Sequence, residues 1–252
     1  MEQIDTTQET LDLALAAELQ AALLPKSCPA DCPNQSAAAR NQMCGSVGGD
    51  FYDFIRLNPE QTAIFIGDVV GHGVRSSLVM AKIMGWLRSR SQDASRPTRV
   101  IADLNRMLME LGEKTNSVML CSLFYGVLDM PSGAMFFVNA GHPKPFLSDR
   151  QVSRTAPLGG RNMLLGVQEF EPEESCHTFT AGQRLVLYTD GITDANNDKG
   201  DYFSDKRLLA VIKENIGATA LQCVDAVFNA VETFRNGGLQ DDDETVVVID
   251  RH

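Results

Sequence analysis

The sequence contains no apolar segment long enough to cross a membrane. Its longest informative uncharged run, residues 115–128, has 14 residues and includes Thr, Asn and Ser, whereas a membrane-spanning helix needs about 20 apolar residues. The first ten residues carry acidic side chains where a signal peptide carries Lys and Arg. Export is therefore not indicated, and we expect a cytoplasmic protein with no membrane partner.

Positive charge is also scarce. The 252 residues include 22 Lys and Arg against 33 Asp and Glu, which gives a net charge of −11. Phosphate backbones repel such a chain, so we expect no nucleic-acid partner. Six cysteines do not suggest a disulfide framework at this length. Because Cys28, Cys32 and Cys44 have no histidine nearby and fit no zinc spacing, we interpret them as reduced thiols.

What is present is an ordinary globular composition, with 44% hydrophobic and 22% charged residues. This length suits one large domain or two small ones. Near the N-terminus, Leu11, Leu15, Leu19 and Ala22 recur at helical spacing before Pro25. Periodicity does not identify what this stripe faces, so two interpretations remain open: a helix packed on the core, or a helix that binds a partner or a second copy.

Farther along, strand-like and helical segments follow without strict alternation. Residues 26–39 are rich in Pro, Cys, Asn and Ala, and we interpret them as a linker or irregular entry. Strands are predicted over 62–67, 118–129, 134–139, 184–189 and 245–250. Helices are predicted over 74–88, 98–111, 206–216 and 218–234. Strands near both ends with paired helices between them favour an α+β fold.

Aspartates stand at strand ends and beside glycines. They are Asp50, Asp53, Asp68, Asp190, Asp194 and the run Asp241-Asp242-Asp243 before the last strand. Carboxylates at strand ends converge if the strands share a sheet. A single Asp-Gly pair is more often a turn, but several such sites together are harder to dismiss.

Clustered aspartates require positive charge, since like charges a few ångströms apart raise one another's pKa. Hard divalent cations such as Mn²⁺ or Mg²⁺ suit a site made of oxygen ligands, whereas zinc does not. Glycine beside each aspartate lets the backbone approach such a site and supply a carbonyl.

Five motifs occur in the order that one enzyme family shows. They are Gly48-Gly49-Asp50-x-Tyr52-Asp53, Gly67-Asp68-x-x-Gly71-His72-Gly73, Asn139-Ala140-Gly141-His142, Tyr188-Thr189-Asp190-Gly191-x-x-Asp194 and Asp242-Asp243-x-Thr245. Together with Leu19-Gln20-x-x-Leu23-Leu24-Pro25, they resemble the PPM-type metal-dependent serine/threonine phosphatases of the bacterial SpoIIE/RsbU branch. The resemblance covers about residues 18–250.

The resemblance implies an αββα sandwich, in which two antiparallel sheets are flanked by helix pairs, with an N-terminal helix before it. It divides the chain into an N-terminal helical segment, residues 1–25, and a phosphatase domain, residues 26–252. The first segment is expected to serve regulation or dimerisation, through a sensor partner or a second copy of the chain.

The same resemblance implies a centre of two divalent ions, Mn²⁺ or Mg²⁺. By motif match, its ligands are four carboxylates and one carbonyl, from Asp50, Asp68, Asp190, Asp242 and Val69. Asp194 and Asp243 either support these ligands or bind an additional ion. Asp53 lies outside the direct ligands.

A water activated by the two ions would then hydrolyse phosphoserine or phosphothreonine. His72 is a candidate general acid for the leaving alkoxide, because histidine titrates near neutrality; its alternative role is to anchor the loop after the metal strand. His142 is expected to orient a loop. In this branch the typical substrate is a phosphorylated anti-sigma-factor antagonist in a partner-switching pathway.

Two positions depart from the family pattern. Met43-Cys44-Gly45-Ser46 occupies the stretch where eukaryotic relatives place a phosphate-binding arginine, and Arg40 is only a distant candidate. Glu244 stands where an apolar residue is usual before Thr245. It must be paired if it faces the core, and it adds a ligand if it faces the site.

Two other functions compete with this one. A catalytically inactive binding module with the same fold is the alternative, although ionised clusters are costly to keep unpaired. A metal-dependent nuclease would also need clustered acids, but the net charge of −11 and the lack of a basic stripe disfavour it.

Overall fold

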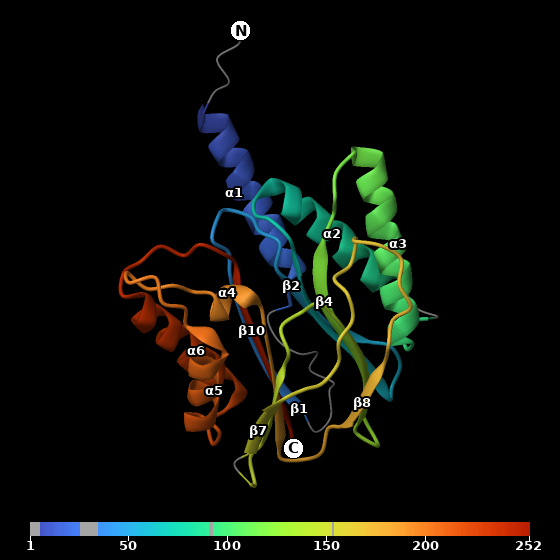
Figure 1. The fold of residues 1–252 in the computed structure, drawn as a ribbon, viewed down its shortest axis with the longest axis vertical. Coiled ribbons are helices and arrows are strands. Elements are labelled where there is room, and N and C mark those ends of the chain that lie inside the picture. Colours follow the sequence, from blue (N-terminus) through green and yellow to red (C-terminus); the bar gives the residue numbers. More distant parts are fainter. Residues whose placement is uncertain (1–5, 26–34, 91–92, 153) are drawn as a thin grey trace.

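A computed structural model describes residues 6–25, 35–90, 93–152 and 154–252, which form two five-stranded antiparallel sheets packed face to face (Figure 1). The strand order of the first sheet is β1 (Gln35–Gln42), β10 (Glu244–Arg251), β9 (Gln183–Tyr188), β6 (Phe146–Asp149) and β7 (Arg154–Pro157). The order of the second is β2 (Phe51–Arg56), β3 (Gln61–Val69), β4 (Cys121–Asp129), β5 (Ala134–Ala140) and β8 (Ser175–Thr178).

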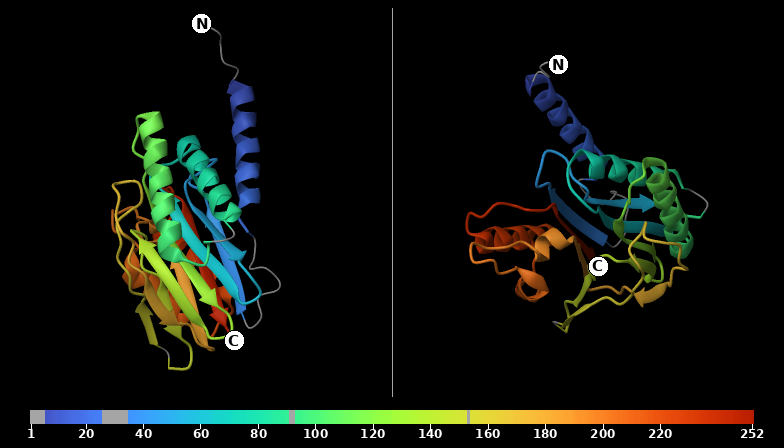
Figure 2. Two further views of the ribbon diagram at one scale, coloured as in Figure 1. Left: turned by 90° about the vertical axis from the view of Figure 1, so that its right-hand side faces the viewer. Right: turned by 45° about the horizontal axis from the view of Figure 1, so that its top comes forward.

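Helices cover the outer faces of both sheets (Figures 1 and 2). The second sheet carries α2 (Val74–Ser89) and α3 (Pro97–Thr115), and the first carries α5 (Ser204–Glu214) and α6 (Ala220–Arg235). The short α4 (Asp190–Thr193) follows β9, and α1 (Thr6–Leu23) packs on α2 and extends away from the sandwich. This arrangement confirms the predicted αββα sandwich with an N-terminal helix.

Two apolar cores hold the layers together. One lies between the sheets and under α2 and α3, and it includes Phe51, Phe65 and Phe137. The other lies between the first sheet and the α5–α6 pair, and it includes Val186 and Val224. Because β3 and β4 are covered on both faces, nearly all of their residues are buried. This double burial explains why these strands read as continuous apolar runs.

Local chemistry sets the helix ends. A capping box between Thr219 and Gln222 begins α6, and a proline at the first position begins α3. Asn116 ends α3 in the left-handed conformation, at φ 48°. Among the described residues, no helix is both long and apolar enough to cross a membrane.

The linker predicted over 26–39 is wrong from Gln35 onward, because β1 begins there and pairs with β10 along its whole length. The β1 sequence has three alanines and no β-branched residue, so its own strand preference is weak. Pairing with β10 therefore imposes the extended conformation. Cys28 and Cys32 lie outside the described residues, and the four cysteines within them are free thiols.

The apolar stripe of α1 does not pack on the core. Leu11, Leu15 and Leu19 are 54%, 49% and 71% exposed, whereas Gln20 and Leu24 are buried. Exposed leucines in one helical row are typical of a surface that a partner covers. Of the two interpretations of this stripe, the core-packing one is wrong for these three leucines.

A buried ion pair joins the first sheet to the turn between α5 and α6. Arg184 on β9 contacts Asp250 on β10, with Nε 2.6 Å from Oδ1 and Nη2 2.8 Å from Oδ2. The same guanidinium donates to the carbonyls of Asn215 and Ala218, at 2.9 Å and 2.5 Å. Because both charges are fully buried, each depends on the other for compensation.

We expect Arg184→Met to lower the free energy of unfolding by about 3–5 kcal/mol, because Asp250 then loses its main partner inside the protein. Only the longer contact of Asp250 to Arg150, at 3.5 Å, would remain. Urea denaturation measures the change. Arg106→Met is the control, since its ion pair with Asp103 is exposed and contributes below about 1 kcal/mol. If the two variants were equally stable, the Arg184–Asp250 ion pair would not contribute the expected free energy of unfolding.

Candidate metal centre

Both sheets contribute aspartates to one end of the sandwich. Asp50 directly precedes β2, and Asp68 lies near the end of its neighbour β3 in the second sheet. Asp190 follows β9, and Asp242 and Asp243 precede its neighbour β10 in the first sheet. Since neighbouring antiparallel strands run in opposite directions, the end of one strand lies beside the beginning of the next.

These aspartates lie within electrostatic range of one another. Burial, followed by the charges of Asp190, Asp242 and Asp243, raises the pKa of Asp68 to about 7. Burial, followed by the charge of Asp68, raises the pKa of Asp50 well above its usual range. The structure therefore brings side chains from distant parts of the chain into one cluster.

Asp190 and Asp242 form the exposed side of the cluster. Burial is the largest cause of the raised pKa of each, and the charge of Asp194 contributes to both. His72, exposed in the loop after β3, acts in the opposite direction and lowers the pKa of Asp242. Within the described part of the chain, the Lys and Arg ion pairs all go to carboxylates outside this cluster.

The donor set fits a hard divalent cation. No three His, Cys, Asp or Glu side chains of the described residues are already gathered as a metal-binding group. The aspartates nevertheless repel one another, and a cation between them would offset that repulsion. Their donors are all oxygen, which Mg²⁺ and Mn²⁺ prefer over the nitrogen and sulfur ligands of zinc.

Asp50 is buried, and two threonine hydroxyls bind the same oxygen of its carboxylate. Thr189 Oγ1 donates to Asp50 Oδ2 at 2.7 Å, and Thr245 Oγ1 donates to it at 2.5 Å. Thr245 Oγ1 accepts from Asn41 Nδ2 at 2.8 Å, and Thr189 Oγ1 accepts from the Thr245 N–H at 3.0 Å. Since each hydroxyl has one proton, this network directs both protons to Asp50. It therefore holds the carboxylate in one orientation.

Asp243 binds the loop that leads to Asp50. Its Oδ1 accepts from the Cys44 N–H at 2.8 Å, and its Oδ2 accepts from the Gly49 N–H at 2.7 Å. A Cβ atom added at Gly48 would lie 1.8 Å from Asp243 Oδ2. Only glycine permits this approach, which explains the first residue of the Gly48-Gly49-Asp50 motif.

Gln20 connects α1 to the same loop, and residue-type reasoning alone did not single it out. Its Nε2 donates to the Gly48 carbonyl at 2.8 Å, and the Gly48 N–H donates to its Oε1 at 3.0 Å. Arg88 adds a second link, because it donates to the Leu23 carbonyl at 2.7 Å and to Asp53 at 2.6 Å. In the sequence, the signal that could have identified Gln20 was its place in the motif Leu19-Gln20-x-x-Leu23-Leu24-Pro25.

Two other predicted residues have polar partners of their own. Asp53 is paired with Arg88, so its charge is compensated there. His142 is buried, its Nδ1 lies 2.8 Å from Ser122 Oγ, and burial lowers its pKa to about 3. A buried imidazole with this partner agrees with the expectation that His142 orients the loop after β5.

The structure also resolves both departures from the family pattern. Glu244 forms a buried ion pair with Arg235 of α6, so it faces away from the aspartates. Burial raises the pKa of Glu244 to about 7. Arg40 stacks over the Phe228 ring at 4.2 Å from its centroid, again on the α6 side. Neither side chain belongs to the candidate centre.

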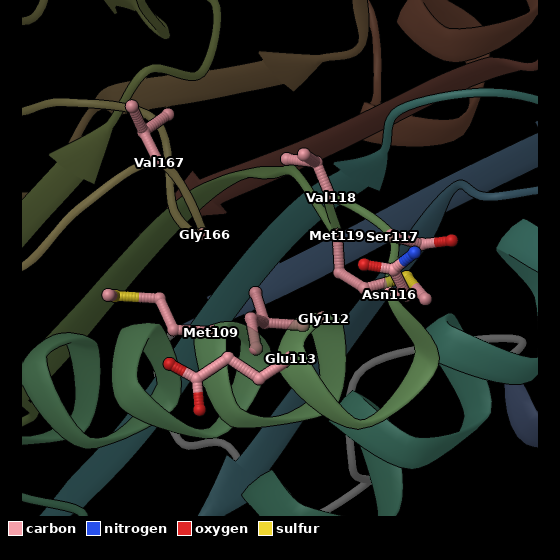
Figure 3. A pocket seen from close by; sticks show the side chains of 10 residues that line it. Met109, Gly112, Glu113, Asn116, Ser117, Val118, Met119, Gly166 and Val167 are labelled. Atoms are coloured by element: carbon pink, nitrogen blue, oxygen red, sulfur yellow. The ribbon is translucent and has the colours of Figure 1, made fainter.

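A groove elsewhere contains none of the predicted site residues. It lies between α3 and two loops, residues 116–119 and 166–167, and has a volume of about 390 Å³. Figure 3 shows Met109 and Glu113 of α3 on one side, with Val118 and Val167 across from them. The aspartate cluster therefore remains the candidate centre.

Comparison with known families agrees with this geometry. The model of the family described as Stage II sporulation protein E (SpoIIE) matches residues 58–252, which is more than half of the chain. The chain belongs to the SpoIIE family. Four of the five motifs lie wholly within the matched residues, and the Gly48-Gly49-Asp50 motif lies just before them.

Two curated relatives match most of the chain. Protein IcfG of Synechocystis sp. is 26% identical over 273 residues, which cover 96% of this chain and 42% of that protein. Phosphoserine phosphatase RsbP of Bacillus subtilis is 23% identical over 206 residues, which cover 81% of this chain and 49% of that protein. The chain thus spans less than half the length of these two relatives.

Solved structures share the fold of this SpoIIE-family chain. The SiaA-PP2C domain of Pseudomonas aeruginosa superposes with a TM-score of 0.84 at 17% identity, covering 98% of this chain and 99% of that one. RsbX in complex with magnesium gives a TM-score of 0.62 at 14% identity, covering 87% and 96%. The predicted membership of the PPM-type phosphatases, SpoIIE/RsbU branch, is confirmed.

We expect Thr245→Val to weaken Mn²⁺ binding by about 10-fold or more, because residues that orient metal-binding carboxylates have effects of this size. Calorimetric titration with Mn²⁺ measures the affinity, and thermal unfolding measures the stability. Thr245→Ser keeps the hydroxyl and serves as the control. If both variants bind Mn²⁺ as the unmodified protein does, the hydroxyl does not orient Asp50 for a metal.

Proposed function

We propose that this SpoIIE-family chain is a metal-dependent phosphatase that hydrolyses phosphoserine or phosphothreonine in a protein substrate. The observation that carries the proposal is the convergence of Asp50, Asp68, Asp190 and Asp242 from two sheets into one mutually repelling cluster. Such a cluster fits cations and, through them, an anionic phosphate.

In this proposal, the groups that hold two Mn²⁺ or Mg²⁺ ions are those of Asp50, Asp68, Val69, Asp190 and Asp242. When bound, the ions supply positive charge for the phosphate oxygens and lower the pKa of a water. The magnesium complex of RsbX supports a divalent cation in a protein of this fold. Asp194, exposed beside Asp190, is the candidate ligand for an additional ion.

Other residues of the chain position these groups or transfer protons. Asp243 uses both oxygens on backbone N–H groups, so we assign it to the support of the Asp50 loop. His72 is exposed beside Asp242, where a histidine can hold a proton for the departing serine or threonine oxygen. With Arg40 stacked on Phe228, phosphate binding is assigned to the cations.

The proposed substrate is a phosphorylated signalling protein, with an anti-sigma-factor antagonist as the specific candidate. RsbP, a phosphoserine phosphatase by name, supports the phosphoserine specificity. The alternative, a binding module of the same fold without turnover, predicts cation or protein binding in the absence of hydrolysis.

We expect Mn²⁺-dependent hydrolysis of para-nitrophenyl phosphate, abolished by EDTA. Asp190→Ala should lower kcat by about 100-fold or more, because a catalytic cation stabilises the transition state by several kcal/mol. The exposed Asp225→Ala on α6 is the matched control and should leave kcat unchanged. Absence of Mn²⁺-dependent turnover would favour the binding module, and cleavage of DNA or RNA would favour a nuclease.

We further propose that residues 1–25 regulate the phosphatase domain, residues 26–252, through self-association or a partner. The exposed leucines of α1 provide the surface for such contacts. Gln20 forms hydrogen bonds with both the carbonyl and the N–H of Gly48. It thereby links the position of this helix to the loop before Asp50.

Replacement of Leu11, Leu15 and Leu19 by lysine should lower the molar mass in solution or change the rate of hydrolysis, because charges in the stripe oppose apolar association. Light scattering measures the mass, and a variant that begins at Pro25 tests the whole helix. Leu239→Lys, at a residue 84% exposed outside α1, is the control. Unchanged mass together with unchanged activity would refute the proposal.

A further inference from the structure

We propose that a pocket beside α4 binds the substrate protein next to its phosphorylated residue, and that it selects an apolar side chain flanked by acidic ones. This inference rests on the proposed phosphatase function and adds the substrate class. The pocket has a volume of about 550 Å³, within the range of pockets that hold ligands.

The floor of the pocket is aromatic and apolar. Phe146 of β6 stacks on Tyr188 of β9, with ring centroids 5.7 Å apart and planes 10° from parallel, and Leu209 of α5 lines the same space. The Tyr188 hydroxyl donates to Asp205 at 2.7 Å, which fixes the ring and uses the one proton of that hydroxyl. An apolar side chain can therefore enter without leaving that proton unpaired.

The pocket is lined by two lysines and one carboxylate, that of Asp205, in a chain with a net charge of −11. Lys144 and Lys206 both line it, although the sequence has only seven lysines. Both are exposed, and among the described residues neither takes part in an ion pair. Two ammonium groups around an apolar floor complement a segment with carboxylates around an apolar residue. A small anion alone would leave the aromatic floor uncovered.

The pocket borders the candidate metal centre. Thr193, which lines it, ends the short helix that begins with Asp190, and one helical turn is about 5 Å long. Pro143 and Lys144 line it directly after His142. A residue bound here is thus within a few extended residues, about 3.3–3.6 Å each, of a phosphate at the aspartates.

The test compares two synthetic phosphoserine peptides of equal length that share a leucine and differ only in flanking glutamates or lysines. We expect the unmodified protein to hydrolyse the acidic peptide with a kcat/KM about 10-fold higher, from two weak ion pairs together. Lys144→Glu/Lys206→Glu should remove this preference and leave hydrolysis of para-nitrophenyl phosphate unchanged. Lys114→Glu/Lys213→Glu, with the same charge change on exposed positions of α3 and α5, should retain the preference.

The outcomes separate this inference from the proposed function. If para-nitrophenyl phosphate is hydrolysed but the peptides are not distinguished, or if the Lys144/Lys206 variant still prefers the acidic peptide, the docking pocket is refuted. Loss of the preference when the leucine is changed to alanine would support the apolar floor. If free glutamate bound the pocket as strongly as the acidic peptide does, measured by inhibition of the hydrolysis of that peptide, the pocket would be a simple anion site. This result would overturn the proposal. No hydrolysis of any phosphate ester would refute the phosphatase function itself.

Discussion

The aspartates gathered at one end of the sandwich repel one another, and the fold holds them there against that repulsion. Strands of two sheets keep Asp50 and Asp68 near Asp190 and Asp242, and each charge makes the ionisation of its neighbours harder. The surrounding fold offsets part of this cost with hydroxyl and backbone N–H donors. A cation that binds only the folded state would add its binding free energy to stability. Cation binding at this centre would thus be linked to folding.

The supporting contacts come from elements far apart in the sequence. Asn41 of β1 orients Thr245 of β10, and Asp243 holds the loop before Asp50. Gln20 also binds that loop, through the N–H and the carbonyl of Gly48. If α1 moved, its contacts with Gly48 would therefore move Asp50, which lies two residues farther along the chain. No series of further side-chain movements would be needed.

Sequence patterns predicted the elements whose own residues form a continuous apolar run or an apolar periodicity. The apolar run of β3 and the long helices are such cases, and the aspartate motifs identified residues that the fold does gather. The patterns missed β1, because Gln35–Gln42 is a strand only through its pairing with β10. On α2, the patterns do not show which apolar residues are buried, since Met84 is buried whereas Val74 and Leu78 are exposed. The partner of Glu244 was equally hidden, because Arg235 approaches it only in three dimensions.

The alternation of side chains at the end of β9 has a consequence for how such proteins diverge. Tyr188 points outward to the pocket beside α4, while its neighbour Thr189 points inward to Asp50. A one-residue insertion or deletion in β9 would exchange the two faces. Such a change in length would therefore disturb the aromatic pocket and the Asp50 contact together, whereas an exchange of one side chain can alter either alone.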